Sequence, residues 1–167
     1  LAPIVSLQAH YTLAGRDLER EIVPMLEAED IGLMVWSPLS GGFLSGKYDR
    51  EGKTAEGRRV DFDFPPIDKD RAYDAIEVMR GIAADKACTV PQVALAWLLH
   101  QKAVSSVIVG AKRVDQLTDN VGAAEVSLSE DDLDALDAVT RLPGEYPGWM
   151  LERQSQYRAH LMQGKRG

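Results

Sequence analysis

The residue types best suited to chemistry in this sequence lie in a glycine-rich run, WSPLSGGFLSGKY, at positions 36–48. The run follows an apolar stretch at 31–36 that predicts a buried strand. Its glycines allow backbone N–H groups to approach an anion, Ser37 and Ser45 add hydroxyls, and Lys47 adds a positive charge. Trp36 offers a flat apolar face for a ring. The run therefore favours a site for an anionic ligand that contains a ring, although an ordinary glycine-rich turn has the same composition.

A second candidate site is the run VIVGAK at 107–112, which ends another apolar stretch and precedes a helix that begins near Val114. Backbone amides at a helix N-terminus, next to a lysine, suit a phosphate group. Arg113 stands where a serine or threonine cap is usual, so two basic residues adjoin the helix start. The alternative interpretation is that Lys112 and Arg113 are solvated surface charges.

Three short apolar runs predict the strands that position these loops, at residues 4–8, 31–36 and 104–109. Amphipathic stretches separate them, and this alternation is typical of parallel βα units. We expect the three strands to be parallel neighbours with helices along one outer face. Both candidate loops would then lie at the carboxyl ends of the strands, where ligands bind in α/β proteins.

Helical spacing predicts a helix after the first strand, with Asp17 as a candidate cap and Pro24 expected to kink or shorten it. Thr89 and Ser129 each begin a sequence that fits a capping box. The remaining helical segments are expected at 73–83, 89–101, 117–124 and 129–140, and a long charged loop is expected at 49–69. We divide the chain into βα units at 1–140 and a carboxyl-terminal tail at 141–167.

The composition, 45% hydrophobic and 27% charged over 167 residues, is that of one globular domain. A net charge of -7 disfavours nucleic acids and anionic membrane surfaces as partners. The longest apolar run, at 93–99, is far shorter than the roughly 20 residues that a membrane helix needs. Cys88, the single cysteine, cannot form a disulfide within the chain, which favours a reducing, cytoplasmic setting. The opening LAPIVSL resembles no targeting sequence, and we expect the chain to begin within a larger protein.

Five motifs follow one another in a family's order: SLQ at 6–8 with Tyr11, the run at 36–48, PQVALAW at 91–97, GAK at 110–112 with Gln116, Leu117 and Asn120, and EYPGWM at 145–150. Together they resemble the carboxyl-terminal portion of the aldo-keto reductase family, and the last motif is similar to the tail of bacterial members. The resemblance covers nearly the whole chain. It implies a TIM (β/α)8 barrel, of which three units are visible here, so that this chain forms an incomplete barrel.

The resemblance also implies NADPH, held in extended form without a Rossmann motif. Gln8 would hydrogen-bond the nicotinamide carboxamide, and Trp36 would stack on the nicotinamide ring. The residues implied around the pyrophosphate and its riboses are Ser37, Pro38, Leu39, Gly41, Leu44 and Lys47. Those implied around the 2′-phosphoadenosine end are Gly110, Ala111, Lys112, Gln116, Asp119 and Asn120. Gln116 stands where relatives often have an arginine.

The family's catalytic Tyr, Lys, Asp and His would all precede Leu1, so we assign no catalytic residue to this chain. His10 and Tyr11 lie beside Gln8, and we interpret them as packing or helix-entry residues. His100 and His160 show no ligand spacing, and no metal site is expected.

The resemblance therefore implies an enzyme that reduces aldehydes or ketones with NADPH, this chain being its cofactor-binding part and inactive alone. Two alternatives remain: a regulatory subunit that binds NADPH and a partner protein, or a truncated product without a function of its own. The expected ligand besides the cofactor is a small carbonyl substrate. The missing amino-terminal barrel half, or another chain, is expected to cover the edges and inner face of the sheet.

Overall fold

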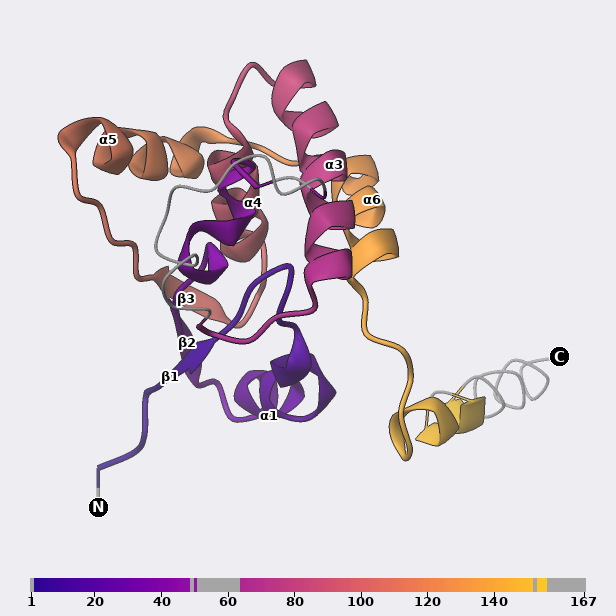
Figure 1. The fold of residues 1–167 in the computed structure, drawn as a ribbon. Coiled ribbons are helices and arrows are strands. Elements are labelled where there is room, and N and C mark those ends of the chain that lie inside the picture. The colour runs from indigo at the N-terminus through magenta and orange to yellow at the C-terminus, as the bar shows by residue number, and fades with distance from the viewer. Residues whose placement is uncertain (1, 49, 51–63, 152, 156–167) are drawn as a thin grey trace, which may run out of the picture.

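The centre of the fold is a parallel three-stranded sheet, seen in a computed structural model that describes residues 2–48, 50, 64–151 and 153–155 (Figure 1). The strands are β1 (Ser6–His10), β2 (Gly32–Trp36) and β3 (Val104–Val107). Their order in the sheet is β1-β2-β3, and both pairs are parallel. The prediction of three parallel neighbours is confirmed.

The first strand is shorter at its start than its apolar residues suggested. Ile4 and Val5 are 76% and 73% exposed, and β1 begins at Ser6. Ser6 pairs with Gly32, the first residue of β2, so the preceding residues have no strand residue opposite them. The third strand likewise ends at Val107, not at 109, although the N–H of Ile108 still donates to the Val35 carbonyl at 2.8 Å.

A 3-10 turn, η1 (Asp17–Arg20), and the short helix α1 (Ile22–Ala28) connect β1 to β2. The prediction that Asp17 caps a helix is wrong, because Arg16 and Glu21 hold the two capping positions and neither makes a side-chain capping bond. Pro24 is the third residue of α1, where a proline lacks only an N–H that has no partner within the helix. The helix is accordingly short, as predicted.

The second connection contains the 3-10 segment η2 (Ser40–Ser45), α3 (Lys69–Asp85) and α4 (Val90–Leu99). Thr89 forms the predicted capping box with Gln92 at the start of α4. In the expected loop at 49–69, helix α3 already begins at Lys69, and residues 49 and 51–63 lie outside the described residues. Over the described part of the chain no single helix is long and apolar enough to cross a membrane; only α3 and α4 together would meet that test, and they are bent by 98°.

After β3 come α5 (Val114–Gly122), η3 (Ala123–Glu125) and α6 (Glu130–Thr140). Ser129 forms the second predicted capping box, with Asp132. Residues 141–145 are irregular, and residues 148–151 and 153–155 are helical. Residues 156–167, which include His160, lie outside the described part.

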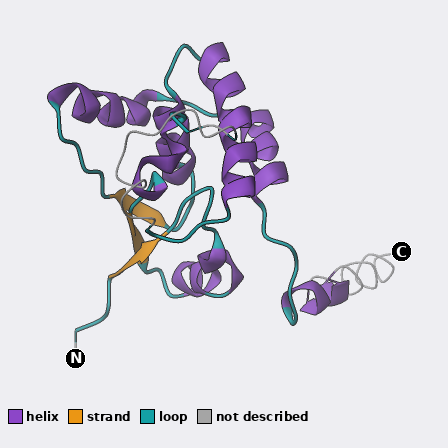
Figure 2. Ribbon diagram, in the orientation of Figure 1, coloured by secondary structure: helices purple, strands orange, loops and turns teal. Residues whose placement is uncertain are grey.

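The two faces of the sheet have different environments. Leu33 and Val35 are fully buried and belong to one core cluster with residues of α1 and α4, such as Leu26 and Val93. Side chains alternate along a strand, so Gln8, Met34 and Trp36 lie on the opposite face, where they are exposed or half-exposed. Figure 2 shows α1, α3, α4 and α6 gathered to one side of the three strands. The core is thus built on one face of the sheet.

Candidate functional site

The carboxyl ends of β1 and β2 bring together the two residues predicted to hold a nicotinamide ring. Gln8 pairs with Met34, and His10 pairs with Trp36, so Gln8 and Trp36 share one face on adjacent strands. The rings of His10 and Trp36 have centroids 5.0 Å apart and are tilted by 41°. Phe64 is stacked on Trp36 at 6.0 Å with an angle of 13° between the ring planes. The site therefore combines an amide with an aromatic cluster, to which Phe64 adds a residue that we did not predict.

The glycine-rich loop after β2 has an unusual backbone. Five of its residues adopt a positive φ: Ser37, Ser40, Gly41, Gly42 and Gly46, at 51°, 50°, 64°, 89° and 77°. The Gly41 N–H donates to Ser37 Oγ at 3.1 Å, and the Gly42 N–H donates to the Leu39 carbonyl at 2.9 Å. The N–H groups of Gly41 and Gly42 are therefore used inside the loop. These two glycines serve its left-handed conformation. They do not present the free N–H groups that the sequence predicted.

Lys47 is the positively charged group of this loop. Its side chain is exposed and lies over the ring of Tyr48, with Nζ 5.2 Å from the ring centroid. The same Nζ would be 3.7 Å from a Cβ placed on Gly42, so the ammonium lies close to the glycines. Within the described part of the chain Lys47 forms no ion pair. Its charge is therefore available to an anion that approaches the loop.

In the second predicted segment, at 110–120, the structure distinguishes Lys112 from Arg113, which the sequence did not. Arg113 forms a two-armed ion pair with Asp115, with N–O distances of 3.0 and 2.8 Å, and this pairing holds the pKa of Asp115 below its usual range. Lys112 forms no ion pair with a described residue. A Cβ on Gly110 would meet nothing within 4 Å. The segment before α5 thus has open space at Gly110, close in sequence to the ammonium group of Lys112, which has no ion pair with a described residue.

Gln116 makes a capping contact at the same helix end. Its Oε1 accepts from the Lys112 N–H at 3.0 Å. This bond ties the start of α5 to the preceding loop and provides a partner for the Lys112 N–H. Asn120, one turn further on, is half-buried on α5.

The first turn of α4 connects the two predicted halves of the site. Thr89 Oγ1 donates to the Asp119 carboxylate at 3.0 Å, and Gln92 Nε2 donates to the Asp119 carbonyl at 3.0 Å. A Cβ on Gly46 would come within 3.2 Å of Val90, so the glycine-rich loop packs on the same turn. We had recognised Thr89 and Gln92 only as a capping box, and nothing in their spacing indicated the contact with Asp119, 30 residues away from Thr89.

Tyr11 is unsuited to proton donation. Its side chain is 1% exposed, and its hydroxyl donates to Glu19 Oε1 at 2.6 Å. Burial, together with the adjoining Glu19 carboxylate, raises the pKa of Tyr11 far above its ordinary value. The interpretation of Tyr11 as a packing residue is confirmed.

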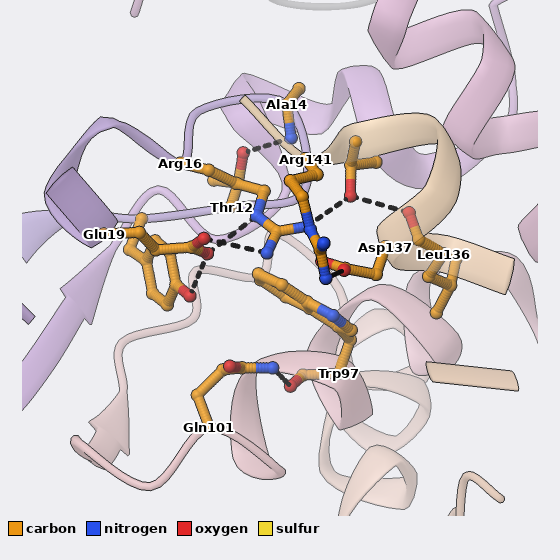
Figure 3. A network of polar contacts seen from close by, with 11 residues as sticks. Thr12, Ala14, Arg16, Glu19, Trp97, Gln101, Leu136, Asp137 and Arg141 are labelled. Atoms are coloured by element: carbon orange, nitrogen blue, oxygen red, sulfur yellow. Dashed lines mark hydrogen bonds and ion pairs between the residues drawn. The ribbon is translucent and has the colours of Figure 1, made fainter. Parts of the chain in front are cut away.

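Arg16 is the centre of a polar network that the sequence did not reveal (Figure 3). Its guanidinium binds Glu19 through two bonds of 2.7 and 2.8 Å and lies over the ring of Trp97 at 5.2 Å. It also contacts Asp137 at 2.6 Å and Thr140 at 2.7 Å, both on α6. We call Tyr11, Arg16, Glu19, Trp97, Asp137 and Thr140 the Arg16 network. It joins the segment after β1 to α4 and α6, and it fixes the loop that follows Gln8 and His10.

Among the described residues, no three His, Cys, Asp or Glu side chains come together in a way that could hold a metal ion.

Comparisons with known proteins agree with this arrangement of strands and loops. The family description "Aldo/keto reductase family" matches residues 1–141. Uncharacterized oxidoreductases of Mycobacterium tuberculosis and Mycobacterium bovis are 37% identical over 139 residues, which are 83% of this chain and 43% of theirs. The NADH-specific methylglyoxal reductase of Escherichia coli is 32% identical over 126 residues, 75% of this chain and 39% of that protein.

A solved structure is also similar to this chain. The crystal structure of a thermostable aldo-keto reductase in complex with the inhibitor epalrestat superimposes with a TM-score of 0.61 at 25% sequence identity. The match covers 82% of this chain and 40% of that one. The chain thus spans about two-fifths of the length of these relatives.

Proposed function

Because the chain belongs to the aldo/keto reductase family, we propose that it binds NADPH for an enzyme that reduces aldehydes or ketones. The nicotinamide supplies a hydride when the cofactor is bound. The residues present fit such a ligand. Gln8 and Trp36 offer an amide and a flat ring on one face of the sheet, while Lys47 and Lys112 offer ammonium groups without ion pairs to described residues. These groups match the carboxamide, ring and phosphates of a nicotinamide dinucleotide in chemical type.

The observation that supports NADPH most directly is the difference between Lys112 and Arg113. Arg113 is held by Asp115, whereas Lys112 stands at the start of α5 beside the open backbone of Gly110. An ammonium group at a helix N-terminus is suited to the 2′-phosphate that distinguishes NADPH from NADH.

The part of the chain described here would bind and orient the cofactor, and the proton would come from elsewhere. Tyr11 is the tyrosine nearest to Gln8 in sequence, and its buried, hydrogen-bonded hydroxyl cannot serve a substrate. We expect the homogeneous 167-residue chain to lack carbonyl reductase activity, because a positioned general acid contributes roughly 100- to 10,000-fold. Robust oxidation of NADPH by this chain with a reactive aldehyde would contradict that expectation.

The central test compares Lys112→Met with Arg113→Met in the complete protein by fluorescence titration of NADPH and NADH. We expect Lys112→Met to weaken NADPH binding by roughly 10-fold, the lower end for a charged hydrogen bond because Lys112 is exposed, and to leave NADH binding nearly unchanged. Arg113→Met is the matched control, since its guanidinium is paired with Asp115.

Three results would lead to other conclusions. Equal losses for both cofactors would show that the 110–120 segment is assigned in the wrong register. A selective loss in Arg113→Met alone would move the phosphate contact to Arg113. Tighter binding of NADH than of NADPH by the unchanged protein would favour a cofactor preference like that stated in the name of the E. coli relative.

A further inference from the structure

A buried hydrogen bond connects the loop after β1 with the loop after β2. Thr12 Oγ1 and Ser40 Oγ are 3.1 Å apart, and both residues are fully buried. The two residues are 28 positions apart in the sequence, and β1 and β2 end beside each other in the sheet. One loop follows Gln8, the residue implied at the nicotinamide, and the other contains the residues implied at the pyrophosphate.

The Thr12 end of this bond is held firmly. Thr12 and Gly15 exchange two backbone hydrogen bonds of 3.1 and 3.0 Å, and Thr12 Oγ1 also accepts from the Ala14 N–H at 3.0 Å. The neighbouring Tyr11 and Arg16 belong to the Arg16 network, which attaches this loop to α4 and α6. The loop therefore offers a fixed point against which a second loop can be positioned.

The Ser40 end lies at the start of the consecutive left-handed residues of the glycine-rich loop. Ser40 has a φ of 50°, a region that a residue with a Cβ seldom adopts, and Gly41 and Gly42 continue it. The Ser40 N–H donates to the Ser37 carbonyl at 2.8 Å. The bond to Thr12 thus acts on the first of three consecutive residues with a positive φ, Ser40 to Gly42.

We propose that Thr12 and Ser40 are positioning residues for the cofactor: their mutual hydrogen bond sets the glycine-rich loop at the correct place relative to the carboxyl end of β1. The assignment rests on the proposed function, because it assumes that these two loops hold one dinucleotide. A loop placed correctly before the ligand arrives need not be ordered by binding, which improves affinity. Since the residues implied in both loops would contact the part common to NADPH and NADH, the effect should be the same for both cofactors.

The experiment measures cofactor affinity and thermal stability of the complete protein in Ser40→Ala, Thr12→Val, the double variant, and Thr12→Ser. We expect Ser40→Ala to weaken NADPH and NADH alike by about 3- to 10-fold, the effect of one hydrogen bond. Thr12→Val also removes the acceptor of the Ala14 N–H and should weaken both cofactors at least as much. The Michaelis constant for the cofactor should rise by the same factor at nearly constant kcat. The double variant should lose little more than Thr12→Val alone, because both substitutions remove the Thr12–Ser40 bond. Thr12→Ser keeps the hydroxyl and should restore binding.

Thr140→Val is the matched control. Thr140 is also a fully buried threonine with two hydroxyl hydrogen bonds, to Arg16 and to the Leu136 carbonyl. Its hydroxyl contacts the Arg16 end of the loop after β1, but it bonds neither Thr12 nor Ser40. We expect it to lower the melting temperature without changing cofactor affinity.

The outcomes separate this assignment from the proposed function. Unchanged affinity in Ser40→Ala, fully additive losses in the double variant, or an equal loss in Thr140→Val would overturn the positioning role while the protein still binds its cofactor. Absence of binding of either nucleotide by the unchanged protein would overturn the proposed function and this assignment with it. A loss confined to NADPH would also contradict it, because that pattern belongs to Lys112.

Discussion

Replacing Arg16 by methionine should destabilise the protein more than any other change at a single charged residue that we propose here. The Arg16 side chain is 8% exposed and lies between Glu19 and Asp137, whose side chains are 26% and 22% exposed. Methionine retains much of the aliphatic stem but leaves both carboxylates without their partner. Losing one member of a buried ion pair costs about 3 to 5 kcal/mol, and we expect about 3 kcal/mol because the carboxylates keep some contact with water. For a chain of this size that corresponds to a melting temperature lower by about 6 to 12 °C.

The pH dependence of this loss tests the mechanism. Burial alone would raise the pKa of Asp137, but the hydrogen bond and charge of Arg16 outweigh it, and the pKa lies below its usual value. A carboxyl whose pKa is lowered in the folded state stabilises the protein above its unfolded pKa, and that stability is lost as the pH falls through the folded pKa. The difference in stability between the unchanged protein and Arg16→Met should therefore shrink from about pH 5 downwards.

The assay is urea denaturation at a series of pH values, with Arg20→Met as the matched control. Arg20 is 29% exposed and its pairs with Asp17 and Glu145, at 3.8 and 3.0 Å, lie at the surface. Surface pairs contribute about 0 to 1 kcal/mol. If Arg16→Met cost no more than Arg20→Met, or if its cost were independent of pH, the Arg16 network would not be the stabilising contact inferred here.

Three further predictions concern two helix N-termini and the loop between α3 and α4. Thr89→Ala removes a helix cap and the bond to Asp119, so urea denaturation should show a loss of about 1 to 2 kcal/mol that Thr89→Ser largely avoids; equal losses would exclude the hydroxyl as the cause. Although burial opposes it, Lys86 lowers the pKa of Asp132, so Asp132→Asn should lose about 1 kcal/mol at pH 7 and approach the unchanged protein as the pH falls through the lowered pKa; a constant difference would contradict this. Burial raises the pKa of Cys88, so iodoacetamide at pH 7.5 should alkylate the folded protein more slowly than the urea-unfolded one, and equal rates would refute it.

Sequence reasoning predicted well the features that are determined within a few residues or by the spacing of apolar residues along the chain. The capping boxes at Thr89 and Ser129 form as expected, because both partners lie in the same helical turn. The parallel order of the strands followed from the alternation of apolar runs with helices. The strand ends were placed less well, since the length of a strand depends on its partner: β1 begins where Gly32 gives it a residue to pair with.

The contacts missed from the sequence join residues far apart along the chain. Arg16 and Thr140 are separated by 124 positions, and an arginine beside Asp17 and Glu19 looks like any solvated charge. The expected cap at Asp17 failed for a related reason, because the chain there forms a 3-10 turn whose preceding residue, Arg16, is drawn into the core. Composition could not distinguish Lys112 from Arg113 either, since the difference depends on the ion pair with Asp115.

The alternation of residues along β1 and β2 explains how one short sheet can serve both folding and binding. Leu33 and Val35 supply the core from one face, and their packing does not involve the residues between them. Met34 and Trp36 therefore lie on a face that the core of the described chain does not require, next to Gln8 and His10. Substitutions on that face should cost little stability compared with the 2 to 5 kcal/mol typical of truncating a buried leucine. A strand that divides its residues in this way can change its ligand contacts while the helices behind it keep the same fold.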